Sequence, residues 1–215
     1  NQKKQVAGKN LNYSKCSSEV RKGLDESRRA EWDKWKSFNA AQVMKGAEFK
    51  PLLDEGHKQI PLQWIEVDKA DHKRRAGKKH VPEYKSRLVG CGQFENTVGI
   101  RSDSPTSDTE AINIILSWAT SNGLKVKAAD IRNAYFQGKP ADRLILLRPP
   151  KGGLPGEGDM SYAGLFARVP IYGFRDAGRQ FWKQLREVIV RAGLVENRIL
   201  KALYHCQEDN DIKVM

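Results

Sequence analysis

Apolar residues recur at helical spacing in three stretches of the chain, and each stretch predicts an amphipathic helix. These stretches are residues 26–44, with Trp32, Trp35, Phe38 and Met44; residues 107–121; and residues 176–192, with Ala177, Phe181, Leu185, Val188 and Ile189. The middle stretch has the clearest beginning, because Ser107 and Glu110 have the spacing of a capping box. Gly123 and Gly193 are the expected terminators of the second and third helices.

Short runs of residues that favour extended structure lie between these helices and predict strands. The runs are residues 60–67, 84–89, 124–129, 144–147 and 165–169. Residues 203–206 and 212–214 flank an acidic turn and predict a β-hairpin. A turn or short helix is expected from Asn133, and the glycine-rich residues 151–160 are expected to form a loop. This order of elements predicts an α+β fold, with an antiparallel sheet and helices packed on one face.

The charge of the chain indicates a polyanionic partner. Lys and Arg number 38 and Asp and Glu 26 in 215 residues, which gives a formal net charge of +12. Nucleic acid is the simplest partner for such an excess, and a basic soluble protein without a polyanionic partner is the alternative.

The sequence gives little indication of a zinc-binding, disulfide-bonded or membrane protein. The three cysteines, Cys16, Cys91 and Cys206, are far apart, so neither a zinc knuckle nor a disulfide framework is expected. A reducing compartment fits best. The four histidines form no set with metal-ligand spacing, and no apolar run approaches the length of a membrane span. We therefore expect no membrane partner.

A basic run separates the first two predicted strands. It consists of Lys73, Arg74, Arg75, Lys78 and Lys79, together with Gly77 and His80. The glycine and the lack of large apolar residues predict a loop or the tip of a hairpin. Cations on such a tip can contact a phosphate backbone, but the run can equally be a solvated turn.

Asp130 follows the predicted strand of residues 124–129. A carboxylate at the end of a strand can point into a cleft, where a hard cation such as Mg²⁺ accepts oxygen ligands. The alternative is that Asp130 caps the turn or helix that follows it.

Six blocks of sequence, taken in order, resemble the reverse transcriptases of copia-type retrotransposons. They are Tyr84-Lys85-Ser86-Arg87-Leu88-Val89, similar to Y-K-A-R-L-V; Ser104-Pro105-Thr106, similar to S-P-V/T; residues 130–138, similar to D-V-x-x-A-F-L-x-G; residues 147–152, similar to x-x-P-P-G-F; residues 171–182, similar to L-Y-G-L-K-Q-S-P-R-x-W-Y; and Leu203-Tyr204-His205, similar to the strand before the second catalytic motif. Each block is loose alone, but their order is specific to the family.

The resemblance implies a role for particular residues in an RNA-directed DNA polymerase. Asp130 would be catalytic and would bind two Mg²⁺ ions, with Mn²⁺ as an alternative, assisted by the Ile131 carbonyl group. Tyr135 would lie under the sugar of the incoming nucleotide. Lys85 and Arg87 would hold its triphosphate. The remaining nucleotide-binding residues would be Tyr172, Gly173 and Arg175.

Departures from the family pattern qualify this assignment. Asp176 adds a negative charge beside Arg175, where it can instead cap the next helix. Cys91-Gly92 lacks the positive charge of the usual A-K-G. The Y-V-D-D motif, which carries the second set of catalytic carboxylates, is not among the 215 residues, so we expect these residues alone to be inactive as a polymerase.

The resemblance also implies the organisation and the partners of the protein. We expect a polar linker or arm in residues 1–25, a helical segment in residues 26–54, and an incomplete reverse-transcriptase fingers and palm in residues 55–215. The implied partners are an RNA or DNA primer–template, deoxynucleoside triphosphates and the remainder of a Pol polyprotein, in an intracellular location such as a cytoplasmic particle or the nucleus. The alternative function is a non-enzymatic transposon relic that binds nucleic acid through its basic surface.

Overall fold

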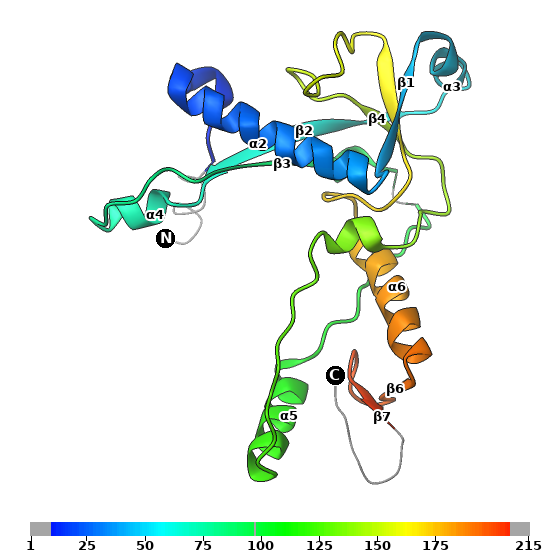
Figure 1. The fold of residues 1–215 in the computed structure, drawn as a ribbon. Helices are drawn as coiled ribbons and strands as arrows, with labels where there is room; N and C mark the ends of the chain where they lie inside the picture. The colour runs from blue at the N-terminus through cyan, green and yellow to red at the C-terminus, as the bar shows by residue number, and fades with distance from the viewer. Residues whose placement is uncertain (1–9, 97, 207–215) are drawn as a thin grey trace. The chain divides into compact units, whose positions relative to one another are not determined.

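The computed structural model describes residues 10–96 and 98–206 (Figure 1). The chain forms two compact units, and each is described by itself. The first unit consists of Asn1–Asn96 and Ala141–Phe174, and the second of Thr97–Pro140 and Arg175–Met215. Within the described ranges, no helix is both long and apolar enough to cross a membrane.

A five-stranded sheet forms the centre of the first unit. Its strands are β1 (Ala41–Lys45), β2 (Gln59–Asp68), β3 (Tyr84–Gly90), β4 (Leu146–Arg148) and β5 (Ala163–Ala167), in the order β1-β5-β4-β2-β3. Neighbouring strands are antiparallel, except that β2 and β4 pair in parallel. The expectation of a mixed chain with helices and a mostly antiparallel sheet is confirmed, whereas the parallel pair was not expected.

Helix α2 (Ser18–Ser37) packs against β3 and runs along the β2–β3 ribbon (Figure 1). Its apolar face buries Leu24, Trp32 and Trp35 almost completely. Burial of side chains of this size contributes about 1.5–3 kcal/mol each, so this contact is a main source of the stability of the first unit.

The ends of α2 differ from the prediction of a helix over residues 26–44. The helix begins at Ser18, because the Ser17 side chain accepts a hydrogen bond from the Val20 backbone amide. It ends at Ser37, where Asn39 adopts a left-handed conformation with φ 47°. The chain then continues as β1, which contains Met44.

Five short elements complete the first unit. They are the 3₁₀ turns η1 (Tyr13–Lys15), η2 (Gly46–Glu48) and η3 (Gly92–Phe94) and the short helices α3 (Lys50–Asp54) and α4 (Asp71–Arg75). Helix α4 lies at the tip of the β2–β3 ribbon, so the basic run is a hairpin tip as predicted, but its first half is helical.

The second unit contains two helices and a small hairpin. Its elements are α5 (Thr109–Ser121), the 3₁₀ turn η4 (Ala134–Gln137), α6 (Ala177–Arg191), β6 (Leu194–Glu196) and β7 (Tyr204–Cys206). Helix α6 contacts η4 and β6, and Gly193 ends it with φ 90°. Both predicted helices of this unit and the turn after Asn133 are therefore confirmed.

Two local predictions in the second unit are wrong, and a third falls partly outside the described residues. The N-cap of α5 is Asp108, and the Ser107 hydroxyl instead donates a hydrogen bond to the Ala202 carbonyl oxygen, so the predicted capping box does not form. Residues 124–129 form no strand although they are all described. Strand β7 pairs with β6, and its predicted partner, residues 212–214, lies outside the described residues.

Candidate nucleotide-binding face

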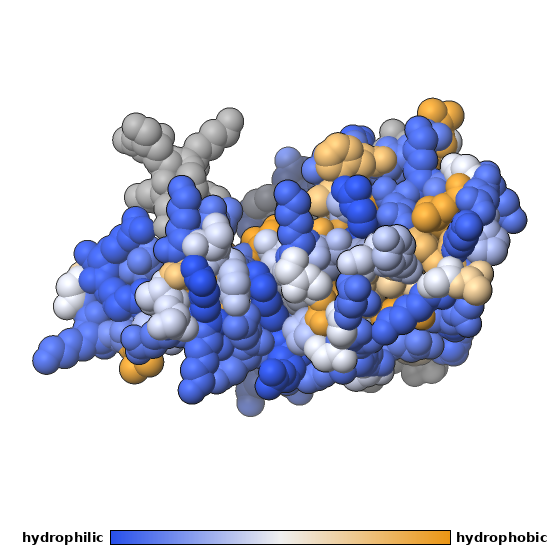
Figure 2. Space-filling view, turned by 90° about the horizontal axis from the view of Figure 1, so that it is seen from above, coloured by the Kyte–Doolittle hydropathy of each residue, from blue (hydrophilic) through white to orange (hydrophobic). Residues whose placement is uncertain are grey.

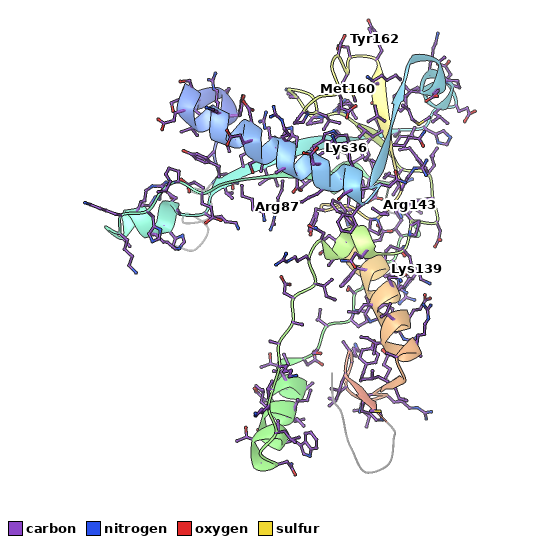
Figure 3. All side chains as sticks on the ribbon, viewed as in Figure 1. Lys36, Arg87, Lys139, Arg143, Met160 and Tyr162 are labelled. Atoms are coloured by element: carbon purple, nitrogen blue, oxygen red, sulfur yellow. The ribbon has the colours of Figure 1, made fainter. Side chains whose placement is uncertain are left out.

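The side chains of β3 alternate between a face covered by α2 and an open face. Ser86 and Leu88 point toward α2: the Ser86 hydroxyl donates to the Leu24 carbonyl oxygen at 3.3 Å, and Leu88 is fully buried. Because successive side chains of a strand point to opposite faces, Lys85 and Arg87 lie on the open face. Figure 3 labels Arg87 on this strand. The sheet thus brings both predicted triphosphate ligands to the same face.

The loop that carries Tyr172 joins this open face at Arg87. The Arg87 guanidinium carbon lies 5.9 Å from the centre of the Tyr172 ring, within the range of a cation–π contact. The backbone amide of Gly90 donates a hydrogen bond of 2.8 Å to the Tyr172 carbonyl oxygen. Three of the predicted nucleotide-binding residues, Lys85, Arg87 and Tyr172, therefore occupy one region of the first unit.

Cations surround Lys85. Partial burial lowers the pKa of its ammonium group, and the positive charges of Lys69, Arg87 and Lys34 lower it further, while Glu31 acts in the opposite direction. A lowered lysine pKa means that the charged form is disfavoured there, so a bound anion would relieve the repulsion. Lys69 and Arg87 are thus close enough to Lys85 to repel its charge.

Gly173 forms the bend that follows Tyr172. It has φ 98°, and the Phe174 backbone amide donates a hydrogen bond of 3.3 Å to the Ile171 carbonyl oxygen across the bend. Positive φ at this value favours glycine, because a Cβ atom would strain the backbone. Ile171 and Phe174 are buried on either side, which anchors the exposed bend to the core.

Asp130 lies on an exposed segment of the second unit rather than at a strand end. Asn133, with φ 52°, occupies the N-cap position of η4, so the alternative that Asp130 caps this turn is not supported. Ile131 is exposed next to it, and Tyr135 is half-buried in η4. Ile131 and Tyr135 therefore lie near Asp130 because they are close to it in sequence.

The oxygen donors around Asp130 do not make a complete metal site. Its carboxylate and the Ile131 carbonyl group are hard donors of the kind that Mg²⁺ prefers. Within residues 10–96 and 98–206, however, no group of three or more His, Cys, Asp or Glu side chains could hold a metal ion. The described residues thus supply at most a part of the ligand set.

Arg175 and Asp176 also belong to the second unit. Arg175 is exposed, and Asp176 occupies the N-cap position of α6 without a side-chain capping hydrogen bond. The buried Asp176 carboxylate instead accepts a hydrogen bond of 3.4 Å from the Gln180 side chain. The prediction that Asp176 lies at the start of the helix is correct, but its side chain contacts the first turn in another way.

The five cations of the basic tip differ in their surroundings. Arg74 pairs with Asp68, and Arg75 pairs with Asp71 at 2.7 Å. The other three, Lys73, Lys78 and Lys79, are exposed. Hydrophilic residues dominate this end of the ribbon in the view from above (Figure 2). The lysines therefore offer charge to a partner more readily than the arginines, whose charge local acids offset.

Sequence reasoning missed two residues beside the bend at Gly173, Gly90 and Gly92. A Cβ atom on Gly92 would overlap the Gly173 carbonyl oxygen, and one on Gly90 would lie 2.9 Å from the Phe174 ring. The available signal was the pair of glycines directly after a predicted strand, which is typical of a close backbone approach.

A hollow elsewhere in the first unit contains none of the predicted site residues. It measures about 960 Å³, and its mainly apolar lining includes Phe49, Leu53, Met160 and Tyr162. Its lining carries Lys50 and Arg148 but also Asp159. This hollow lacks the gathered cations of the open face, so the open face is the better candidate for a nucleotide.

Comparison with known proteins agrees with the motifs. Residues 52–215 match the model of the family described as reverse transcriptase (RNA-dependent DNA polymerase), so the chain belongs to that family. Over 135 residues, or 61% of the chain, it is 27% identical to the retrovirus-related Pol polyproteins from transposons RE2 and RE1 of Arabidopsis thaliana. The resemblance to copia-type retrotransposon reverse transcriptases is thereby confirmed, and the chain is a segment of such a reverse transcriptase.

The matched part is small relative to those relatives. The aligned residues cover 9% of each Pol polyprotein. No solved structure matches the chain. The activity, substrates and partners of the whole protein are therefore matters for proposal.

Proposed function

We propose that this segment holds the triphosphate of an incoming deoxynucleotide during RNA-directed DNA synthesis. The observation that carries the proposal is the open face of β3, where Lys85 and Arg87 lie together and the Tyr172 ring lies beneath the Arg87 guanidinium group. Family membership supplies the reaction class, which is nucleotidyl transfer.

The chemistry of phosphoryl transfer suits this arrangement. The protein contributes mainly positioning and neutralisation of charge, because little covalent chemistry falls to its side chains. Lys85 would act as a compact cation on the phosphate oxygens, and Arg87 would donate two parallel hydrogen bonds from its planar guanidinium group.

Divalent metal ions belong to the chemistry of the family, and Asp130 with the Ile131 carbonyl group would supply part of their ligand set. The described donors do not complete such a site, so no step of the proposed mechanism depends on them. Tyr135, Gly173 and Arg175 are also proposed nucleotide contacts, and their assignment likewise rests on the family resemblance.

Primer–template binding is the second part of the proposal. The net charge of +12 and the exposed Lys73, Lys78 and Lys79 support contacts with a phosphate backbone. In this assignment, the first unit corresponds mainly to fingers and the second to part of a palm. The remainder of a Pol polyprotein would be the covalent partner, as the names of the relatives suggest.

The triphosphate site can be tested by titration calorimetry of the 215-residue chain with dTTP. Replacing Lys85 and Arg87 together by Ala should weaken binding by about tenfold or more, since charge-assisted hydrogen bonds contribute about 1.5–3 kcal/mol each. The matched control replaces Lys22 and Arg29, an exposed lysine and arginine of α2, and should leave the affinity unchanged.

The same titration distinguishes the proposed triphosphate site from the alternative, a transposon relic that binds polyanions through charge alone. Such a protein would lose affinity equally in the Lys85/Arg87 variant and in the Lys22/Arg29 variant, because both remove two positive charges. Equal losses would therefore refute the proposed triphosphate site.

A further inference from the structure

A crossing of two backbone segments lies next to the proposed triphosphate site. One segment is the end of β3, with Gly90 and Gly92, and the other is the bend at Gly173. A Cβ atom on Gly92 would overlap the Gly173 carbonyl oxygen, and a Cβ atom on Gly173 would overlap the Gly90 carbonyl oxygen. The two segments thus approach as closely as they do only because glycine occupies both.

Hydrogen bonds restrain both sides of this crossing. Gly90 donates to the Tyr172 carbonyl oxygen, and the next backbone amide, that of Cys91, donates to the Pro61 carbonyl oxygen, each at 2.8 Å. The turn η3 follows directly, with a hydrogen bond of 3.1 Å from the Glu95 amide to the Gly92 carbonyl oxygen. The atoms that a Cβ would displace are therefore backbone atoms that cannot move independently.

An ion pair holds η3 from its other end. The buried Glu95 carboxylate pairs with Arg143, a residue that is distant in sequence (Figure 3). On the opposite segment, Ile171 is fully buried and Phe174 packs with its ring next to Gly90. A shift of the crossing would disturb these contacts, so the position of Tyr172 relative to β3 is well defined.

We propose that Gly90, Gly92 and Gly173 are positioning residues, which hold Tyr172 at a set distance from Arg87 so that one nucleotide is recognised at two points. Lys85 and Arg87 would bind the triphosphate, and Tyr172 would contact the nucleoside. This inference rests on the proposed triphosphate site. It adds the prediction that the nucleoside part of the affinity depends on the glycine crossing, whereas the phosphate part does not.

The test compares dTTP with inorganic tripolyphosphate as ligands of the 215-residue chain. For the unaltered chain, dTTP should bind more tightly. Gly92→Ala should weaken dTTP binding by about fivefold or more, the contribution of one aromatic contact to a base, while tripolyphosphate binding changes by less than about twofold. Gly92 does not have positive φ, so the substitution tests the close approach without the added cost of a left-handed conformation.

Gly56→Ala is the matched control. Gly56 belongs to the same unit and has φ 83°, but a Cβ atom there would meet nothing within 4 Å. This control should lower stability slightly through backbone strain and leave the ratio of the two affinities unchanged. A change of that ratio in Gly56→Ala would overturn the inference, because general destabilisation would then explain the effect.

The remaining outcomes are equally informative. A folded Gly92→Ala variant that loses affinity for both ligands, or for neither, would overturn the positioning role. If Gly92→Ala does not fold, the Tyr172→Ala variant serves as the test. It should show the same selective loss of dTTP affinity without a steric clash. An equal loss of affinity for both ligands, or no loss, would overturn the inference. If the unaltered chain does not bind tripolyphosphate, the proposed triphosphate site itself fails.

Discussion

The β2–β3 ribbon of the first unit and residues 124–131 of the second unit both carry residues predicted to bind the nucleotide or its metal ions, yet they differ in how those residues are held. The ribbon is paired over seven residue positions, from Leu62 with Gly90 to Asp68 with Tyr84, and α2 covers one of its faces. Residues 124–131 are exposed and make no strand pairing. The surroundings of Lys85 and Arg87 are therefore specified by tertiary contacts, whereas those of Asp130 are not.

The comparison shows what a strand needs in order to form. Residues 124–131 have an extended pattern, but an extended segment gains little unless its amide and carbonyl groups find partners. The ribbon provides such partners, and α2 buries one of its faces. A functional residue is positioned accurately only where both conditions hold.

The largest effect expected from this comparison concerns stability. Leu88→Ala truncates a fully buried side chain on the face of β3 that α2 covers. It should lower the free energy of unfolding by about 2–5 kcal/mol. Leu124→Ala makes the same change at an exposed position of residues 124–131 and should cost less than about 0.5 kcal/mol. Urea denaturation measures both; similar losses would show that residues 124–131 are packed as well as the ribbon.

The pH dependence of stability sharpens the comparison at the end of the ribbon. Burial alone would raise the pKa of Asp68, but hydrogen bonds from Arg74 and from the amides of Glu83 and Ala70 hold this pKa below its ordinary value of 3.8. A carboxyl group whose pKa is lower in the folded state contributes stability above the ordinary value, and this stability is lost as the pH falls through the lowered pKa.

Asp68→Asn should therefore lower stability at pH 6 by about 1.5–3 kcal/mol, the contribution of a hydrogen bond to a charged group. At pH 3, below the ordinary value of 3.8, the difference between the variant and the unaltered chain should be smaller, because the unfolded chain takes up a proton at Asp68 before the folded chain does. Urea denaturation at both pH values is the measurement. A difference that is constant or grows toward low pH would contradict the assigned cause of the shift.

Salt dependence tests whether the exposed lysines of the tip contact nucleic acid. Affinity for a primer–template should fall steeply between about 50 and 200 mM salt. Replacing Lys73, Lys78 and Lys79 by Ala should flatten this dependence more than replacing Arg74 and Arg75, whose charges Asp68 and Asp71 partly offset. Filter binding at several salt concentrations provides both slopes. An unchanged slope in the triple lysine variant would place the nucleic-acid contacts elsewhere on the chain.

The smallest effect is expected at Asp130. Asp130→Asn should change the free energy of unfolding by less than about 0.5 kcal/mol, because the residue is exposed and does not cap η4. Thermal denaturation followed by circular dichroism suffices as a measurement. A loss of more than about 1 kcal/mol would mean that Asp130 has a structural role, and would weaken its proposed assignment as a metal ligand.

The sequence by itself determined the elements whose pattern is local. The helical spacing of apolar residues in α6 and the runs of strand-favouring residues in β2 and β3 predicted these elements within a few residues. The ordered motifs identified the family, and they placed Lys85 and Arg87 on the same strand. These results depend on neighbours along the chain and needed no knowledge of the fold.

Only the tertiary structure decided which segments pair and which backbones meet. Helix α2 packs against β3, and the parallel pairing of β2 with β4 joins segments that are distant in sequence. The pair Gly90 and Gly92 after the strand indicates a close backbone approach, but only the structure shows that the partner segment is the bend at Gly173. Contacts between distant segments carry no periodic signal, and for that reason sequence reasoning predicted the cations of the site but not what holds them in place.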